Sequence, residues 1–484
     1  MSFWTSQSIA SLTRGEWLVS PPADLSPAGA SIDSRTLHPG QIFFAMLGEF
    51  TDGHRFLPAV LQRGASIAVV DSPVAIPVGV LDEAEGRMGV LRVTSVHAAL
   101  LALGAAYRKT LTRTRVISVG GSNGKTTTTR LVHAVLSTTL RGSSSPKSFN
   151  NDIGVPLTIL NAKADDDYLL CEVGTNAPGE IATLASVVGP DVAVITSIGR
   201  EHLEGLGSLE GVVREEVAIL AGLAPDGTAI VNADAPLLLG AAKEIVAPRQ
   251  GTRLLTFGGA TGADFRLSTI EPTRAGVRFA INRHRAEVPL FGRHNAANAA
   301  AAFAVGVRMG LAESDIIKGL ATAKGPEMRM QRTVASGVEF FNDAYNANPD
   351  SMLAAISTFA DLSSLEPVAS GHRVAILGDM LELGSASPVL HSEIGQAVAA
   401  SNAVDVVHFV GPLSRHAAQG AAGRAGLVIH HHEAATDETC HAIAHSLAGG
   451  DVVLLKGSRG MRLERILQSV LDSAKLSTAN NSTC

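Results

Sequence analysis

The sequence predicts an α/β protein of three domains, on the basis of its length, its alternating apolar runs and two breaks in composition. The chain has 484 residues, and at about 150 residues per domain this length corresponds to roughly three domains. Short apolar runs alternate with helical stretches from residue 116 onward, a pattern typical of doubly wound parallel sheets. The breaks are a basic, threonine-rich stretch at 108–115 and the turn signal Lys324-Gly325-Pro326. We therefore predict domains at residues 1–113, 114–325 and 326–484.

The composition excludes several classes of protein. Apolar residues make up 46% and charged residues 17% of the chain, so neither a disordered nor a fibrous protein is expected. The net charge of −6 provides no positive field for nucleic acid or an anionic membrane. The apolar stretch at 93–107 is too short to span a bilayer, and the first residues lack the order of a signal peptide. We expect a soluble, cytoplasmic protein with no membrane insertion and no nucleic-acid partner.

Continuous apolar runs mark the strands expected in the second and third domains. Those of the second domain are at 116–119, 168–173, 192–196 and 228–231, and those of the third at 374–377, 404–410 and 452–455. Such runs suit strands that are buried on both faces of a parallel sheet. We predict a mostly parallel sheet in the central domain and a doubly wound, Rossmann-like C-terminal domain, with ligands beyond the carboxyl ends of the strands.

A glycine-rich loop directly follows the first of these strands and precedes a helical run. Its sequence is Gly120-Gly121-Ser122-Asn123-Gly124-Lys125-Thr126-Thr127. Glycines allow backbone N–H groups to point at phosphate oxygens, the lysine would reach the terminal phosphates, and the hydroxyl of Thr126 would hold Mg²⁺. Val119 stands where the strict pattern has its first glycine, so the match is to the shorter Gly-x-x-Gly-Lys-Thr form. The sequence predicts a phosphate loop; the alternative is an ordinary strand-to-helix turn.

From this loop onward, and also in the first domain, the sequence resembles the ATP-dependent Mur ligases of peptidoglycan synthesis. The matching blocks follow the family's order and lie at residues 33–35, 40–45, 52–56, 120–127, 150–158, 172–174, 179–181, 202–204, 292–295, 342–352, 377–384 and 456–459. The blocks YNANPDSM (345–352) and LGDMLELG (377–384) are the most specific. They resemble the family member that adds D-alanyl-D-alanine. No Asp-Asn-Pro-Arg block, typical of the member that adds a diamino acid, is present.

The resemblance implies a reaction and a division of labour among the domains. In this family a carboxylate, an amine and ATP give an amide, ADP and phosphate by way of an acyl phosphate. The implied substrates are UDP-N-acetylmuramoyl-tripeptide and D-alanyl-D-alanine, with ATP and Mg²⁺ as cofactors and a monomeric enzyme. The first domain would bind the UDP-linked peptide and the central domain ATP, while the third would bind the dipeptide and close on ATP.

The resemblance also implies roles for individual residues. The expected nucleotide-binding residues are Gly121, Ser122, Asn123, Gly124, Lys125, Thr126, Thr127, Asn295, Arg329 and Asp343. The expected Mg²⁺ ligands are Thr126, Glu172, His202 and Glu216, with His202 helping to hold a second Mg²⁺. The last three act in catalysis together with Lys125. The UDP-sugar would contact Ser34, Arg35, Asp52 and His54, and the dipeptide would contact Asn346, Asn348 and Lys456. The alternatives are a solvated strand end for Glu172, a structural role for His202, a helix cap for Asn295 and an ion-paired surface loop for the first-domain residues.

At one position the sequence departs from the family. Relatives carry a lysine there that reacts with CO₂ to form a carbamate near the second Mg²⁺, whereas this chain has Glu216 and no lysine between Lys163 and Lys243. Our hypothesis is that Glu216 supplies the carboxylate directly. Because the side chain of glutamate is shorter than a lysine carbamate, its carboxylate reaches roughly 3–4 Å less far from the backbone. The helix must therefore lie closer to the metal, or a water must bridge the distance. The alternative is that Glu215 and Glu216 form a solvated helix face.

Two other functions stay open at this stage. One is a different carboxylate–amine ligase of the same superfamily, such as a cyanophycin- or folate-glutamyl-type enzyme, and the first-domain blocks at 33–35 and 52–54 argue against it. The other is a nucleotide-binding homologue that has lost turnover. The missing carbamate lysine favours that homologue, whereas Lys125, Glu172 and His202 oppose it.

Overall fold

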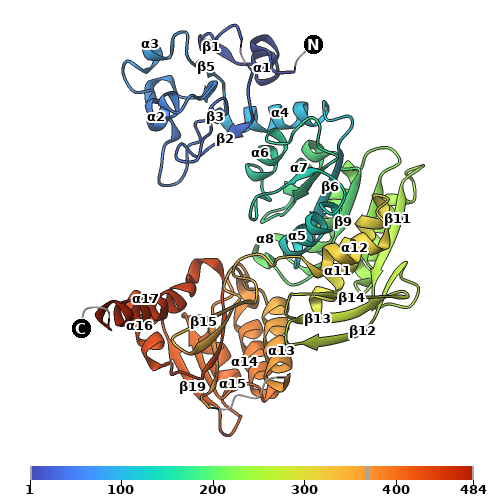
Figure 1. Cartoon of the computed structure of the whole chain (residues 1–484), viewed down its shortest axis with the longest axis vertical. Helices are drawn as coiled ribbons and strands as arrows, with labels where there is room; N and C mark the ends of the chain where they lie inside the picture. Colours follow the sequence, from blue (N-terminus) through green and yellow to red (C-terminus); the bar gives the residue numbers. More distant parts are fainter. Residues whose placement is uncertain (1–2, 25, 366–369, 482–484) are drawn as a thin grey trace.

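The computed structural model describes residues 3–24, 26–365 and 370–481 and shows three α/β domains. They lie along an arc, in which the central domain joins the first domain to the third (Figure 1). Within these ranges no helix is both long enough and apolar enough to cross a lipid bilayer. The predicted fold class is confirmed. The predicted boundaries fall in segments that connect the sheets, because β6 begins at Arg115 and β15 begins at Gln331; they stay predictions.

A five-stranded sheet forms the first domain, with β1 antiparallel to β5 and the other neighbours parallel. In spatial order its strands are β1 (Glu16–Val19), β5 (Gly89–Arg92), β4 (Ile67–Val70), β3 (Ile42–Phe44) and β2 (Ala30–Ser31). Its helices are α1 (Ser6–Thr13), α2 (Leu57–Gln62), α3 (Val80–Ala84) and α4 (Val96–Arg108), with 3₁₀ turns at Gly53–Phe56 and Pro73–Ala75. The apolar face of α4 packs on the central domain, where Gly104 lies against Pro156 and the hydroxyl of Tyr107 donates to the Ala162 carbonyl at 3.0 Å.

The central domain is built on a nine-stranded sheet that is parallel except at one edge. In spatial order its strands are β14 (His284–Val288), β13 (Gly276–Ile281), β12 (Phe265–Thr273), β11 (Arg253–Gly258), β10 (Thr228–Asn232), β9 (Val192–Ile195), β6 (Arg115–Gly120), β8 (Tyr168–Glu172) and β7 (Gly142–Ser144). The four predicted strands are present as β6, β8, β9 and β10. The antiparallel meander β12–β14 has no continuous apolar run, because exposed residues such as Arg278 and Glu287 alternate with buried ones.

Helices cover both faces of this sheet. They are α5 (Lys125–Leu136), α6 (Gly154–Leu160), α7 (Glu180–Val188), α8 (Leu203–Leu206), α9 (Leu209–Val217), α10 (Pro236–Val246), α11 (His294–Arg308) and α12 (Glu313–Ala321), with a 3₁₀ turn at Ala218–Gly222. The alanine-rich helix α11 packs directly against α5. Its fully buried alanines have little side-chain volume, which lets the two helices approach closely and places the start of α11 beside the phosphate loop.

The third domain contains a six-stranded sheet that is parallel except for its edge strand β15. In spatial order its strands are β15 (Gln331–Ala335), β16 (Val338–Asn342), β20 (Val452–Lys456), β17 (Arg373–Gly378), β18 (Val406–Val410) and β19 (Val428–His432). Its helices are α13 (Pro349–Leu365), α14 (Ser387–Ser401), α15 (Arg415–Ala421), α16 (Asp437–Ser446) and α17 (Glu464–Asn481), with 3₁₀ turns at Gly384–Ala386 and Arg459–Met461. The three strands predicted here are confirmed as β17, β18 and β20.

Candidate active site

The phosphate loop connects β6 to α5 and contains two glycines in the left-handed region of the backbone. Gly121 has φ 112° and Gly124 has φ 85°. A Cβ atom on Gly121 would lie 2.4 Å from the Thr196 hydroxyl oxygen, so this turn accepts no larger residue. No side chain in the described part of the chain caps the N-terminus of α5. The first N–H groups of this helix are therefore free to bind phosphate oxygens.

The residues that follow β9 hold the loop in shape. The N–H of Ser122 donates to the Ser197 carbonyl at 2.8 Å, and the N–H of Asn123 donates to the Ser197 hydroxyl at 3.0 Å. The hydroxyl of Thr196 donates to the Asn123 carbonyl at 2.6 Å. The loop is thus fixed from the neighbouring strand, in a conformation suited to a phosphate.

Lys125 carries the positive charge of the loop. Its Nζ donates to the carbonyl of Gly121 at 2.6 Å and lies 3.7 Å from Oε1 of Glu201. Burial acts to lower the pKa of Lys125, but Glu201, Glu216 and Glu172 outweigh burial and raise it. The side chain is therefore a charged ammonium at neutral pH, at the position where a terminal phosphate would need it.

Glu172 ends β8 and faces the phosphate loop, as the sequence predicts. Its Oε1 accepts hydrogen bonds from the hydroxyl of Thr126 and from Nδ2 of Asn150, both at 3.0 Å. Burial raises the pKa of this carboxyl, against the opposing effects of Arg329 and Lys125. Glu172 is 1% exposed, which excludes the alternative of a solvated strand end.

Glu201 and His202 follow β9 and lie beside Lys125. Glu201 is buried, and burial raises its pKa. Nδ1 of His202 lies 2.5 Å from Oε2 of Glu382, a residue of the third domain. Burial acts to lower the pKa of His202, whereas Glu382 and Glu201 raise it and prevail.

Glu216 lies on α9 directly beneath the loop. Its Oε2 accepts the N–H of Gly121 at 2.6 Å, and the residue is 0% exposed. Burial raises its pKa to about 7. Glu215 is also buried and accepts the N–H groups of Gly179 and Ile181 at 2.8 Å. The alternative of a solvated helix face is therefore wrong for both glutamates.

The carboxylates around Lys125 fit a hard cation. Glu172 and Glu216 each have one buried oxygen without a hydrogen-bond partner among the described residues, and Oε1 of Glu201 has no hydrogen bond but lies 3.7 Å from Nζ of Lys125. Leaving a buried oxygen without a hydrogen bond is costly. Within the same ranges no three His, Cys, Asp or Glu side chains are already grouped as a metal site. Mg²⁺ prefers oxygen ligands, takes only one or two carboxylates and keeps several waters. The residues present therefore suit this ion.

The third domain contributes a second wall to the site. Nδ2 of Asn348 donates to Oδ1 of Asn123 in the phosphate loop at 2.9 Å. Nζ of Lys456 lies 2.6 Å from Oδ2 of Asp343 and donates to the Asn346 carbonyl at 3.0 Å. Lys456 is 3% exposed, so its charge is largely used within the domain.

Arg329 and two asparagines complete the site. Nη2 of Arg329 donates to the Thr126 hydroxyl at 3.2 Å, and its guanidinium lies 4.5 Å from the centre of the Tyr345 ring. Nδ2 of Asn295 donates to a backbone carbonyl four residues earlier, while its Oδ1 accepts from Asn298 at 2.9 Å. Both asparagines are buried within α11 and do not act as its N-cap.

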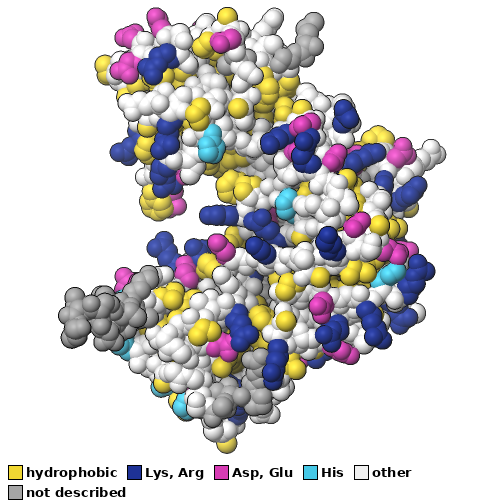
Figure 2. Space-filling view, viewed as in Figure 1, with side chains coloured by type: hydrophobic (Ala, Val, Ile, Leu, Met, Phe, Trp, Pro, Cys, Tyr) yellow, Lys and Arg dark blue, Asp and Glu magenta, His cyan; other side chains and the backbone are white. Residues whose placement is uncertain are grey.

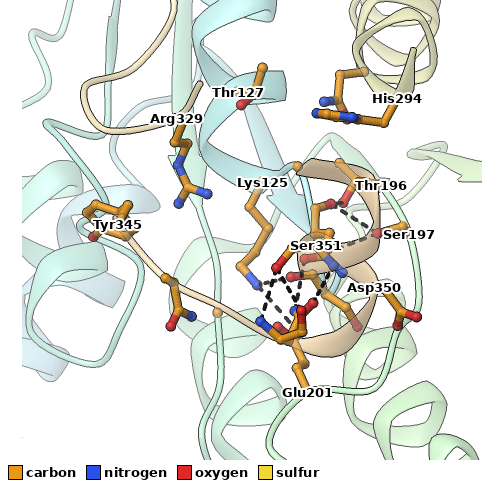
Figure 3. Close-up of a pocket in the computed structure, with 18 of the residues that line it drawn as sticks. Lys125, Thr127, Thr196, Ser197, Glu201, His294, Arg329, Tyr345, Asp350 and Ser351 are labelled. Carbon is orange, nitrogen blue, oxygen red and sulfur yellow. Dashed lines mark hydrogen bonds and ion pairs between the residues drawn. The ribbon is translucent and has the colours of Figure 1, made fainter. Parts of the chain in front are cut away.

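These elements enclose a cavity of about 430 Å³ between the central and third domains. Figure 3 shows Lys125 and Arg329 pointing toward the same space, with Glu201 below and Tyr345 to one side. The predicted residues that line the cavity are Ser122, Asn123, Gly124, Lys125, Thr127, Glu172, His202, Asn295, Arg329, Asp343, Asn346, Asn348 and Lys456. Gly121, Thr126 and Glu216 lie behind this lining and are joined to it by the contacts described above.

Three regions of the chain match domains of one protein family. Residues 28–108 match the Mur ligase family catalytic domain, residues 119–306 the Mur ligase middle domain, and residues 328–459 the Mur ligase glutamate ligase domain. A curated relative, UDP-N-acetylmuramoyl-tripeptide--D-alanyl-D-alanine ligase of Bacillus subtilis, is 35% identical over 97% of this chain and 98% of its own. The chain belongs to the Mur ligase family.

Other members of the Mur ligase family show the same likeness. The Escherichia coli protein with the same name as the Bacillus relative is 32% identical over 93% of this chain and 95% of its own. A crystal structure of MurF from Acinetobacter baumannii superimposes with a TM-score of 0.81 at 28% identity, covering 97% of this chain and 99% of that one. MurF ligase from Thermotoga maritima in complex with ADP gives a TM-score of 0.75 at 25% identity, covering 94% and 99%.

The first-domain residues of this Mur ligase lie outside the cavity. Asp33 binds the exposed guanidinium of Arg35 through both of its oxygens, at 2.8 and 2.9 Å. His54 is 1% exposed; its Nδ1 contacts Asp52 at 2.7 Å and its Nε2 accepts backbone N–H groups. Both ring nitrogens of His54 are therefore engaged within the domain. A UDP-sugar role for Ser34, Arg35, Asp52 and His54 stays a prediction.

Several residues of the Mur ligase site were not predicted from the sequence. Glu201 directly precedes the predicted His202, so a search for acidic neighbours of this histidine could have found it. Asn150 lies within a block used for the resemblance, but no role was assigned to it. Glu382 belongs to the LGDMLELG block, and no local signal in the sequence links it to His202.

Proposed function

We propose that this Mur ligase joins D-alanyl-D-alanine to UDP-N-acetylmuramoyl-tripeptide in an ATP-dependent reaction, as a cytoplasmic monomer that uses Mg²⁺. The main support is the position of Lys125, which is charged and lies at the phosphate loop inside a cavity closed by the third domain. The names of the curated relatives support the choice of substrates.

The chemistry explains why the site contains charges and few nucleophiles. A carboxylate is a poor electrophile, so one of its oxygens first attacks the γ-phosphorus of ATP and ADP leaves. The amine of the dipeptide then attacks the acyl carbon of the resulting acyl phosphate. Inorganic phosphate leaves with the bonding electron pair, and the amine gives up its proton. Phosphoryl transfer of this kind depends on charge neutralisation and in-line positioning.

Charge neutralisation, positioning of the phosphates and exclusion of water each have candidate residues in the site. Lys125 and Arg329 would neutralise the charge that develops on the transferred phosphoryl group, and the free N–H groups at the start of α5 would orient it. Glu172 and His202 would hold Mg²⁺, which supplies charge neutralisation and orients the phosphates. Asn348 and Asn123 join the two domains across the cavity, which keeps water away from a hydrolysable acyl phosphate.

Glu216 would take the place of the family's carbamate. Its carboxyl group lies directly behind the cavity lining and has one buried oxygen without a hydrogen-bond partner among the described residues, so it would supply a carboxylate here without CO₂. Because its other oxygen binds the N–H of Gly121, we propose that Glu216 acts through a bridging water or through the shape of the loop.

The surface between the first and third domains suits an acidic, elongated substrate. Figure 2 shows a deep hollow there, with Lys and Arg side chains gathered around its rim. A UDP-linked peptide carries a diphosphate and free carboxylates, which such a rim would attract. Arg35 and Ser34 of the first domain are the proposed contacts of the UDP-sugar, together with Asp52, which the buried His54 would hold in place.

One experiment separates this function from the two alternatives. The protein is incubated with ATP, Mg²⁺, UDP-N-acetylmuramoyl-tripeptides and a panel of dipeptides and single amino acids, and the products are weighed by mass spectrometry. We expect a product heavier by one D-alanyl-D-alanine residue pair, and phosphate release that needs both substrates. Lengthening by a different amino acid would identify another ligase of the superfamily. Nucleotide binding without phosphate release would identify an inactive homologue.

A further inference from the structure

Glu382 of the third domain contacts the loop that carries His202 in the central domain. Oε2 of Glu382 lies 2.5 Å from Nδ1 of His202, and the carbonyl of Glu382 accepts the N–H of Glu204 at 3.2 Å. Both the side chain and the backbone of Glu382 therefore bind this loop. The function proposed above does not explain this contact.

Both partners adopt a backbone conformation that is unusual for residues with a side chain. His202 has φ 49° and Glu382 has φ 64°. Such left-handed residues cost energy and cluster at functional sites, where the surrounding structure holds them. On one side the N–H of Leu381 donates to the Ser458 hydroxyl at 2.9 Å, and on the other the N–H of Gly205 donates to the His202 carbonyl at 3.0 Å. The fold thus builds this contact from both domains.

The carboxylate of Glu382 decides which ring nitrogen of His202 carries the proton. A carboxylate only accepts hydrogen bonds, so Nδ1 must be the donor. In the neutral ring the lone pair is then on Nε2, which lies 4.0 Å from Oε2 of Glu201 and thus faces the acidic group around Lys125. Histidines that bind metals almost always donate their second N–H to a carboxylate or a carbonyl in this way.

We propose that Glu382 is a positioning residue that presents Nε2 of His202 to the cation of the active site. Because Glu382 belongs to the third domain, the cation site is complete only when that domain has closed on the central domain. This inference rests on the proposed function, since it takes His202 to be a cation ligand. It adds the source of the ligand's orientation and couples domain closure to cation binding.

The rival interpretation is that Glu382 and His202 form one more ion pair that joins two domains. The chain offers a matched comparison, because Asp361 of the third domain binds Arg293 of the central domain at 2.9 and 3.1 Å. Asp361 lies outside the cavity and does not contact His202. Removing the carboxylate of Glu382 or that of Asp361 breaks one ion pair between the same two domains. Of these two carboxylates, only that of Glu382 contacts the imidazole of His202.

The test measures cation binding without turnover. Mn²⁺ serves as the probe, and its dissociation constant in the presence of ADP is obtained by electron paramagnetic resonance for the wild type and for Glu382→Ala, Glu382→Gln and Asp361→Ala. We expect Glu382→Ala to weaken Mn²⁺ binding by about 10-fold or more. Glu382→Gln should restore part of the loss because its amide oxygen still accepts from Nδ1, and Asp361→Ala should stay within about twofold of the wild type.

A second readout reports the ring itself. In protein labelled with ¹⁵N-histidine, and with the His202 signals assigned through His202→Gln, Glu382→Ala should change the tautomer of His202 while Asp361→Ala should not. Equal Mn²⁺ affinities of the wild type and Glu382→Ala, or equal losses of Mn²⁺ affinity in Glu382→Ala and Asp361→Ala, would overturn this inference. Either result would leave the proposed function intact. If the wild type itself bound no Mn²⁺ with ADP, the cation role in the proposed function would fail and the inference with it.

Discussion

Glu216 and Gly121 are joined by a hydrogen bond of 2.6 Å that places a buried carboxylate directly beneath the phosphate loop. The loop also carries Lys125, whose pKa is raised in part by this carboxylate. A group in this position affects the stability of the protein as well as the charge of its site, and the two effects can be measured separately.

The first prediction concerns stability. Burial raises the pKa of Glu216 from 4.5 to about 7. An acid whose pKa is higher in the folded than in the unfolded protein stabilises the fold at a pH below its unfolded-state pKa. This stability is lost as the pH rises to the folded-state pKa, here between about pH 4.5 and pH 7. Glu216→Gln removes this loss, so we expect the variant to melt several degrees above the wild type at pH 8 and by a much smaller margin near pH 5. Thermal unfolding monitored by circular dichroism measures both; a difference independent of pH would contradict the assignment.

The second prediction concerns turnover at the same residue. Glu216→Ala removes the carboxylate proposed to replace the carbamate, and we expect ligation to fall on the order of 100-fold. Glu210 is an exposed glutamate on the same helix, so Glu210→Ala should keep wild-type turnover. Wild-type ligation should also be insensitive to added bicarbonate. Near-normal turnover of Glu216→Ala would remove Glu216 from the mechanism.

The third prediction concerns Arg329. Its guanidinium contacts the Thr126 hydroxyl and the face of the Tyr345 ring. Arg329→Lys keeps a positive charge but loses the planar group that makes both contacts, so kcat/KM for ATP should fall on the order of 100-fold. Tyr345→Phe keeps the aromatic face and should resemble the wild type, whereas Tyr345→Ala should not. Steady-state kinetics with varied ATP tests this, and equal values for Arg329→Lys and wild type would exclude the role.

The fourth prediction concerns a histidine cluster far from the site. The buried ring of His408 stacks on those of His430 and His432, at 4.8 and 5.4 Å between centres, and burial lowers its pKa to about 4. Because the pKa of this base is lower in the folded than in the unfolded protein, the folded protein loses stability as the pH falls below the unfolded-state pKa of 6.5.

From pH 7.5 to pH 5 this loss should amount to about 2 kcal/mol. Urea unfolding at the two values measures it. We expect His408→Phe to show a smaller pH dependence and the exposed His445→Ala to match the wild type. An unchanged dependence in His408→Phe would place the titration elsewhere.

The sequence is most informative where chemistry is local. The phosphate loop and its lysine are consecutive residues, and Glu172 ends an apolar run, so spacing alone brings these residues to one edge of a sheet. The antiparallel strands β12–β14 were missed because they alternate exposed and buried residues, which breaks the continuous runs used to predict strands elsewhere.

Contacts between residues that are distant in the chain could not be predicted from the sequence. Lys456 lines the cavity, and its dipeptide contact stays a prediction, but its ion pair with Asp343, more than a hundred residues away in the chain, has no signal in the sequence. Glu382 meets His202 only because two domains close on each other. The imidazole of His54 was expected at a ligand surface, and its full burial depends on how its turn packs against β4 and the residues after it.

The most direct measurement compares the wild type with Lys125→Met in the ligation reaction. The methionine keeps most of the length of the side chain while removing the charge from the phosphate loop. With ATP, Mg²⁺, UDP-N-acetylmuramoyl-tripeptide and D-alanyl-D-alanine, the wild type should form ADP and the lengthened peptide in equal amounts, and Lys125→Met should form neither. Equal rates of both products in the two proteins would show that the reaction does not take place at this loop.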